Sequence, residues 1–137
     1  MIVVFDTNTI VQAIFWPRST ARRALVGLAL RRFKTALSSE TLAEYTAVTL
    51  RFRSRFPKTE PAGALAWIAA KSVMVEPAPL GRPRSRDAAD DMFVATGLAA
   101  RATYIVAQDR DLLALGKPFG IRIVTPAEFL RLTEPRH

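Results

Sequence analysis

Carboxylates stand at four separated positions along this chain, each where a hydrophobic strand should end or a helix should begin. They are Asp6, Glu44, the pair Asp90–Asp91, and Asp109. Like charges gathered into one site repel and raise each other's pKa values, so a stable cluster requires a counter-ion. A hard divalent cation such as Mg²⁺ or Mn²⁺ prefers oxygen ligands. The spacing therefore predicts a metal site, provided that the fold brings these positions together.

Two of the carboxylates follow predicted buried strands. Asp6 comes directly after Ile2–Phe5, and Asp109 follows Tyr104–Ala107. Strands that alternate with helices predict an α/β fold with a mostly parallel sheet, and such sheets bind ligands beyond the carboxyl ends of their strands, where the strand order reverses. Asp6 and Asp109 should meet there if their strands are neighbours. Asp111 could cap the next helical turn, or act as a supporting or second-metal residue.

Helical periodicity distinguishes the remaining carboxylates. In a predicted helix over 87–101, Asp90 lies in line with the apolar stripe and should point toward the end of the sheet. Asp91 is rotated to the flank, toward solvent or a position behind the ligands. Both acids also favour a helix N-terminus electrostatically. Glu44 lies at the edge of the stripe of a helix ending near 53, where an exposed glutamate is equally ordinary, so its role stays open.

The other predicted elements connect these positions. Asn8 or Thr9 should cap a helix that reaches Trp16, and Pro17 should end it. Ser19 or Thr20, and then Ser38 or Ser39, should cap the next two helices. Further helices are predicted over 62–71 and from 126 onward. Further strands are predicted over Phe33–Leu37, Ser72–Val75 and Ile121–Val124, and a loop is predicted over Glu76–Arg86.

Composition limits the class of protein. Half of the 137 residues are hydrophobic, which suits one domain, predicted over 1–132 with a tail over 133–137. No apolar run approaches the roughly 18 residues of a membrane span, so no membrane association is expected. The apolar start of the chain is interpreted as a strand, not a signal peptide. Cysteine is absent, which excludes disulfides and thiolate metal sites and makes the cytoplasm the expected compartment.

The formal net charge of +8 favours a polyanionic substrate, with nucleic acid preferred over an acidic partner protein or a merely solvated basic surface. The arginines expected to hold RNA phosphates are Arg18, Arg22, Arg23, Arg82, Arg84 and Arg86. Trp67 is expected in the core or an interface. Phe15–Trp16 could pack against protein or stack on a base, and packing is the preferred interpretation.

Four short sequence motifs, taken in order along the chain, resemble those of a known family. DTN after the first strand, S-x-x-x-L-x-E-Y, D-x-x-D-D-x-F, and a strand followed by D-x-D-L-L match PIN-domain nucleases in order and spacing. The nearest group is the PIN-type (VapC-like) toxin components of prokaryotic toxin–antitoxin pairs. The resemblance covers nearly the whole chain, and four motifs in the same order are far more specific than any one of them.

The resemblance implies an Mg²⁺- or Mn²⁺-dependent ribonuclease on a three-layer α/β/α sandwich with about five strands. It also implies a cognate antitoxin and a homodimer. The catalytic quartet carried over from the family is Asp6, Glu44, Asp90 and Asp109, with Asp6, Asp90 and Asp109 as metal ligands. The residues expected to support them are Thr7, Asn8, Ser39, Asp91 and Asp111.

Two departures from the family pattern keep other functions open. Ala107–Gln108 stands where Thr-Gly or a similar small polar pair is usual, which removes a hydroxyl near the site and allows a non-catalytic RNA-binding or regulatory module. Ala88–Ala89 stands where Pro and another acid are usual.

A phosphohydrolase with Asp6 as covalent nucleophile is a third option, but no second Asp lies two residues on. The only histidine, His137, is too near the end of the chain to suggest histidine catalysis.

Overall fold

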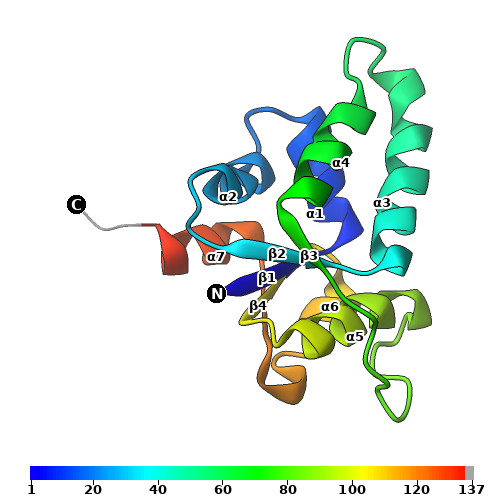
Figure 1. Cartoon of the computed structure of the whole chain (residues 1–137), viewed down its shortest axis with the longest axis vertical. Coiled ribbons are helices and arrows are strands. Elements are labelled where there is room, and N and C mark those ends of the chain that lie inside the picture. The colour runs from blue at the N-terminus through cyan, green and yellow to red at the C-terminus, as the bar shows by residue number, and fades with distance from the viewer. Residues whose placement is uncertain (135–137) are drawn as a thin grey trace.

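A parallel sheet of five strands runs through the centre of the protein (Figure 1). The strands are β1 (Ile2–Phe5), β2 (Lys34–Leu37), β3 (Ser72–Met74), β4 (Tyr104–Val106) and β5 (Arg122–Val124). Their order is β3-β2-β1-β4-β5, and all four pairings are parallel. The structure is a computed structural model that describes residues 1–134. It confirms the predicted α/β class and the sheet of about five strands.

Helices cover both faces of the sheet, which gives the predicted three layers. They are α1 (Thr7–Phe15), α2 (Thr20–Ala29), α3 (Ser39–Phe52), α4 (Pro61–Ala70), α5 (Asp91–Ala100), α6 (Arg110–Leu113) and α7 (Pro126–Thr133). Helix α5 packs on β1, β2 and β4, while α1, α2 and α7 lie on the other side (Figure 1). None of the helices within residues 1–134 is long and apolar enough to cross a membrane. The predicted boundary after residue 132 falls in α7, and residues 135–137 of the predicted tail lie outside the described residues.

The strand order reverses between β1 and β4. Val3 pairs with Tyr104, and the chain leaving β1 stays beside β4 because the Asp6 amide donates to the Val106 carbonyl at 2.9 Å. The carboxyl ends of these two strands therefore open at the same point. The predicted neighbourhood of the two strands is confirmed.

Two contacts attach helices α3 and α5 to this edge. The Thr96 hydroxyl on α5 donates to Ser38 Oγ at 2.9 Å, and Ser38 caps α3 in a reciprocal box with Thr41. The Tyr45 hydroxyl on α3 donates to the Phe5 carbonyl at the end of β1. Both contacts are buried, where an unmade hydrogen bond is costly, so they hold the two helices at fixed positions against the sheet.

Three local predictions are corrected by the capping geometry. Asp6, not Asn8 or Thr9, caps α1, since its side chain accepts from the Thr9 amide. Asp109, not Asp111, caps α6. The predicted helix 87–101 begins with a separate 3₁₀ turn, Ala88–Asp90, before α5. Asp6 and Asp109 each occupy the junction itself, where the carboxylate satisfies backbone amides that the helix leaves unpaired, whereas Asp90 at the start of α5 makes no capping hydrogen bond.

Aromatic side chains complete the packing on the α1 and α7 side. Phe129 of α7 contacts Phe33 and Phe5 edge-on, with ring centroids 5.4 and 6.3 Å apart. Trp67, predicted to lie in the core or an interface, is 37% exposed, and Trp16 is 40% exposed although it packs against other rings. Each tryptophan therefore keeps part of its ring available at the surface.

Candidate metal centre

A pocket of about 180 Å³ opens at the carboxyl edge of the sheet, where the chain leaves β1 and β4, and the start of α1, the middle of α3 and the start of α5 complete its wall. All four carboxylates predicted to be catalytic line it. The acidic residues of its wall are Asp6, Glu44, Asp87, Asp90 and Asp109. No lysine or arginine among residues 1–134 lines the pocket, so its negative charge is not balanced from within. We call this the acidic pocket.

Asp6 is the most firmly held of these groups. Its Oδ1 accepts from the Thr9 amide at 2.8 Å and from the Thr9 hydroxyl at 2.6 Å. Its Oδ2 accepts from the amides of Gln108 and Asp109 at 3.0 and 3.2 Å. Burial raises the pKa of Asp6, and these four hydrogen bonds oppose that rise. Both oxygens are thus engaged and the side chain is only 2% exposed, which does not suit a covalent nucleophile.

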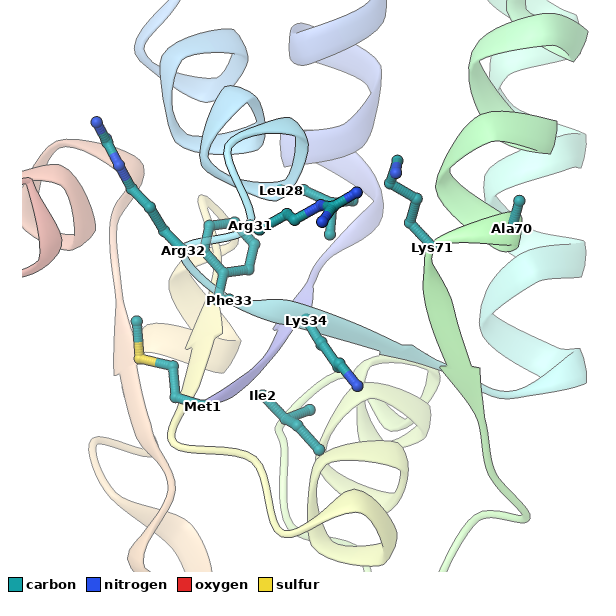
Figure 2. A pocket seen from close by; sticks show the side chains of 9 residues that line it. All are labelled: Met1, Ile2, Leu28, Arg31, Arg32, Phe33, Lys34, Ala70 and Lys71. Atoms are coloured by element: carbon teal, nitrogen blue, oxygen red, sulfur yellow. The ribbon is translucent and has the colours of Figure 1, made fainter.

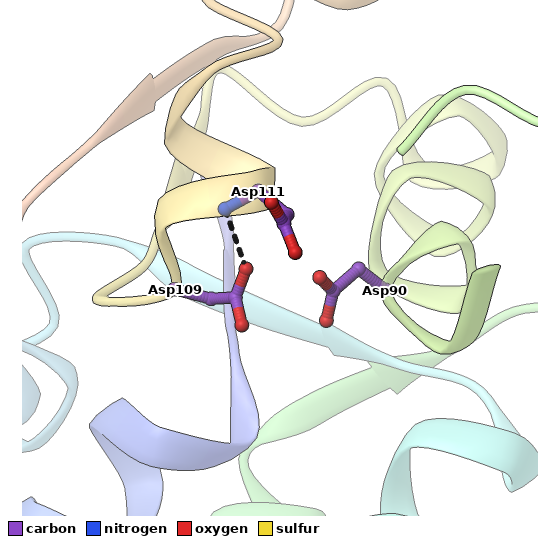
Figure 3. Close-up of side chains that lie close together, drawn as sticks. All are labelled: Asp90, Asp109 and Asp111. Atoms are coloured by element: carbon purple, nitrogen blue, oxygen red, sulfur yellow. Dashed lines mark hydrogen bonds between the residues drawn. The ribbon is translucent and has the colours of Figure 1, made fainter. Parts of the chain in front are cut away.

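Asp109 is fixed by the turn that it caps. Its Oδ1 accepts from the amides of Asp111 and Leu112 at 2.8 and 3.1 Å. Since the Asp109 amide itself donates to Asp6, the backbone and the side chain of this residue are both constrained. The turn also brings Asp111 to the same side of α6, so that both carboxylates extend toward Asp90 (Figure 3).

Asp90, Asp109 and Asp111 form the tightest carboxylate group in the described part of the chain. One oxygen from each can be chosen so that all lie within 4.8 Å of one another. Asp90 is only 8% exposed, and burial, with the neighbouring Asp109 next in importance, raises its pKa to about 7. This trio differs from the predicted ligands Asp6, Asp90 and Asp109, because Asp6 is turned toward backbone amides. The acidic cluster fits a metal site.

Glu44 and Thr7 complete the wall facing the carboxylates. Glu44 is half-buried on α3, and its neighbour Tyr45 anchors that helix turn to the end of β1. Thr7 Oγ1 is buried without a hydrogen-bond partner among residues 1–134. An orphaned buried hydroxyl is uncommon in folded proteins and, in this pocket, fits a polar ligand. The family resemblance placed Thr7 among the supporting residues, but nothing in the sequence indicated that its hydroxyl would be buried without a partner in residues 1–134.

The other predicted supporting residues differ in position. Asn8 is exposed at the rim of the acidic pocket. Asp91 accepts from the amides of Ser85 and Arg84 at 2.7 and 3.0 Å, so it holds the preceding loop and does not face open solvent. Ser39 is exposed, donates to Glu40 at 3.3 Å and does not line the pocket. The buried hydroxyls at this helix start are those of Ser38 and Thr41.

Comparison with known protein families agrees with this geometry. A family model described as the PIN domain matches residues 2–111, which is most of the chain. The chain belongs to the PIN-domain family. PIN domains are in general nucleases, and the matched range contains every residue of the acidic pocket. A comparison with curated proteins found no match.

The unusual pair Ala107–Gln108 leaves this PIN domain's carboxylate contacts intact. Ala107 is buried, and the hydrogen bond from position 108 to Asp6 comes from the backbone amide, which any residue except proline supplies. The hydroxyl that Asp6 accepts comes instead from Thr9. The Gln108 side chain turns away and donates to Gln12 Oε1 at 2.8 Å. The substitution therefore removes no partner of Asp6.

Only half of the predicted RNA-binding arginines of the PIN domain are both exposed and without a partner among residues 1–134. Arg22 donates to the carbonyls of Ala13 and Ile14 at the end of α1. Arg23 pairs with Glu134 at 2.9 Å, and Arg84 donates to Leu80 and stacks over Phe119. The three that are exposed and form no ion pair within residues 1–134 are Arg18, Arg82 and Arg86.

A second charged hollow, of about 460 Å³, lies at the opposite edge of the sheet, where the strands begin. Its cationic residues are Arg31, Arg32, Lys34 and Lys71, and no carboxylate within residues 1–134 lines it. Arg31 and Lys71 extend toward the same opening, whereas Arg32 points away from it (Figure 2). We call this the basic hollow; sequence reasoning placed no site here.

Proposed function

We propose that the protein is a ribonuclease that depends on Mg²⁺ or Mn²⁺ and hydrolyses RNA phosphodiester bonds at the acidic pocket. The observation that carries the proposal is the gathering of five carboxylates around one small pocket, whose wall contains no lysine or arginine of residues 1–134. Such a site favours a divalent cation, because unbalanced carboxylates repel one another. Membership of the PIN-domain family supports the nuclease class.

The donor set suits a hard cation. Asp90 and Asp109 would hold the ion, with the third carboxylate supplied by Asp111, which lies closest, or by Asp6, which would give up one of its present hydrogen bonds. A bound Mg²⁺ or Mn²⁺ supplies Lewis-acid stabilisation of phosphate charge and lowers the pKa of a bound water. The buried, unpartnered Thr7 hydroxyl is a further group available to such a ligand.

The remaining residues of the pocket have separate roles in this proposal. Glu44 is half-buried on the α3 wall and accepts a proton from, or orients, the attacking water. Thr7 donates its hydroxyl hydrogen to a phosphate oxygen, and Asn8 at the rim contacts the adjacent sugar or phosphate. Asp6 positions Asp109 through the backbone amides of the β4–α6 turn.

RNA is the proposed substrate because the protein outside the pocket is strongly basic. The net charge is +8 even though the carboxylates of the pocket are included in that sum. Phosphate contacts from lysine and arginine provide most of the sequence-independent affinity for nucleic acids. Arg18, Arg82 and Arg86 are exposed and form no ion pair with residues 1–134, so we propose them as phosphate contacts.

We further propose that this nuclease is the toxin of a toxin–antitoxin pair in the cytoplasm. The proposal rests on the resemblance of the four sequence motifs to those of PIN-type toxins. It implies a cognate antitoxin and a homodimer. Co-expression with the product of a short neighbouring reading frame would test the pairing, and growth arrest that this product relieves is the expected result.

Cleavage of an end-labelled RNA by the purified protein tests the ribonuclease proposal. We expect cleavage with Mg²⁺ or Mn²⁺, none with EDTA, and a loss of at least about 100-fold in Asp90→Asn, because Asp90 would hold the cation that stabilises transition-state charge. Asp87→Asn is the matched control, because Asp87 lines the same pocket outside the carboxylate trio. Equal cleavage by Asp90→Asn and wild type would refute the proposal.

A further inference from the structure

An open hollow of about 550 Å³ lies beside the C-terminal end of α1, and apart from Arg18 its residues have no role in the function proposed above. The residues that line it are Gln12, Trp16, Pro17, Arg18 and Ser19. No carboxylate within residues 1–134 belongs to its wall. We call it the tryptophan hollow.

The Trp16 ring is held in place from behind. It packs edge-to-face against Phe56 and Phe52, with ring centroids 5.0 and 6.2 Å apart. Its backbone amide donates to the Gln12 carbonyl at 2.9 Å, and Pro17 restricts the chain that follows. The side chain is nevertheless 40% exposed. A ring fixed in this way binds a flat partner with little further loss of conformational freedom.

The tryptophan hollow adjoins the acidic pocket along one face of α1. Asn8 lines the acidic pocket, and Gln12, one helical turn later, lines the hollow. Residues four apart lie on the same helix face, with a rise of about 6 Å between them. This step is comparable to one nucleotide of an extended single strand. Gln108 joins the two sites directly, because its amide donates to Asp6 while its side chain donates to Gln12.

Polar groups at the hollow are available for a ligand. The amide pair uses Gln108 Nε2 and Gln12 Oε1, which leaves Gln12 Nε2 as a donor and Gln108 Oε1 as an acceptor without another partner in residues 1–134. Arg18 is exposed at the rim and pairs with no acid of this part of the chain. An aromatic face, an amide donor and acceptor, and a cation are the groups that bind a nucleotide base and its phosphate.

We propose that the tryptophan hollow binds the base of the RNA nucleotide next to the phosphate held at the acidic pocket. Trp16 stacks on the base, the Gln12–Gln108 pair contacts its edge, and Arg18 contacts its phosphate. The inference rests on the proposed function for the position of the neighbouring phosphate. An RNA nucleotide is preferred to a protein segment for two reasons. Arg18 at the rim pairs with no acid of residues 1–134, and no carboxylate of these residues lines the hollow. The hollow also begins one helical turn along α1 from the acidic pocket, at Gln12 after Asn8.

The two exposed tryptophans of the chain allow a direct test. Trp67→Phe leaves Trp16 as the only tryptophan, and Trp16→Phe leaves Trp67, which has nearly the same exposure but lies on α4. Both variants are made in an Asp109→Asn background, where asparagine still caps α6 and the RNA is not consumed. A six-nucleotide RNA with a terminal label is added with Mg²⁺, and tryptophan emission and label anisotropy are recorded together. We expect saturable quenching of Trp16 in step with anisotropy, and unchanged Trp67 emission.

A cleavage measurement separates this inference from the proposed function. With Asp109 restored, Trp16→Leu should lower kcat/KM by about 10-fold to 100-fold, mainly through KM, as expected for loss of one stacked base. Trp67→Leu is the control and should leave kcat/KM unchanged, and thermal unfolding checks that both variants are folded. If RNA quenches Trp16 in the Trp67→Phe protein but the wild-type protein does not cleave RNA, the hollow is supported and the ribonuclease proposal is refuted. RNA bound by anisotropy with Trp16 emission unchanged would overturn the hollow, whatever the cleavage rate.

Discussion

The two edges of the same parallel sheet carry opposite charges, and they are built in different ways. At the carboxyl edge, Asp6 and Asp109 accept hydrogen bonds from backbone amides, which fixes their carboxylates before any ligand arrives. At the amino edge, Lys34 and Lys71 are exposed, and neither forms an ion pair with residues 1–134. The carboxylates of the acidic pocket are therefore held in fixed positions, whereas the cations of the basic hollow are not. In the function that we propose, the first suits chemistry and the second suits attraction for a polyanion.

Asp6→Asn should give the largest effect, because it removes the group that organises the acidic edge. The asparagine amide nitrogen cannot accept from the amides of Gln108 and Asp109, so at least one buried donor loses its partner. We expect the free energy of unfolding to fall by about 2 kcal/mol, and cleavage to be lost. Urea denaturation and RNA cleavage measure the two. A variant as stable as wild type would show that this edge is not preorganised.

The pH dependence of stability should also distinguish the two edges. The pKa of Asp90 is raised to about 7 from an ordinary value of 3.8, so the folded protein keeps a proton that the unfolded chain releases. This contribution to stability is therefore complete below about pH 4 and is lost as the pH rises through 7. In EDTA, the midpoint temperature of unfolding should decrease as the pH is raised from 4 to 7. The decrease should be smaller in Asp90→Asn. Lys71→Ala, at the basic edge, should follow the wild-type profile.

Removing cations from the basic hollow should weaken attraction without changing the chemical step. For Arg31→Ala combined with Lys71→Ala, we expect kcat to be unchanged and RNA affinity to fall a few-fold at low salt. If both cations contact phosphates, the plot of log K for RNA association against the logarithm of the salt concentration should become less steep by about 1.4. A fall in kcat with an unchanged salt dependence would contradict the separation of roles between the edges.

The smallest predicted effect concerns backbone strain beside the basic hollow. Arg31 and Arg101 both follow helices in the left-handed region, with φ of 58° and 55°. Glycine adopts this conformation without strain, so Arg31→Gly and Arg101→Gly should each stabilise the fold by about 0.5–1 kcal/mol. Only Arg31 lines the hollow, so only Arg31→Gly should also weaken RNA binding. Equal RNA affinity in the two variants would remove Arg31 from the binding surface.

Sequence reasoning located the strand-end carboxylates because an alternating α/β pattern determines where parallel strands open. Helical periodicity likewise placed Asp90, not Asp91, among the buried acids of the pocket. It did not reveal contacts that depend on how distant segments pack. Asp111 and Thr7 were predicted as supporting residues, but the close approach of Asp111 to Asp90 and the unpartnered state of the Thr7 hydroxyl were not. The Gln12–Gln108 pair was not predicted at all.

The predicted arginines illustrate the same limit. Arg22 and Arg84 stood in basic runs and were assigned to RNA, but their guanidinium groups satisfy backbone carbonyls of the protein itself. Composition reports how many cations the chain has, and only the folded structure determines which of them reach solvent. The basic hollow was missed for the converse reason. Arg31, Arg32 and Lys34 stand together in the sequence, but only the fold brings Lys71 beside them.

Direct measurement of metal binding tests the central claim, that the carboxylates of the acidic edge form a site for a divalent cation. Calorimetric titration of Mn²⁺ into the wild type should show saturable binding, and Asp90→Asn should weaken it by at least about tenfold, or about 1.4 kcal/mol. Asp87→Asn, in the same pocket, should bind nearly as tightly as wild type. Mn²⁺ binding of equal affinity in Asp90→Asn and wild type would contradict the account.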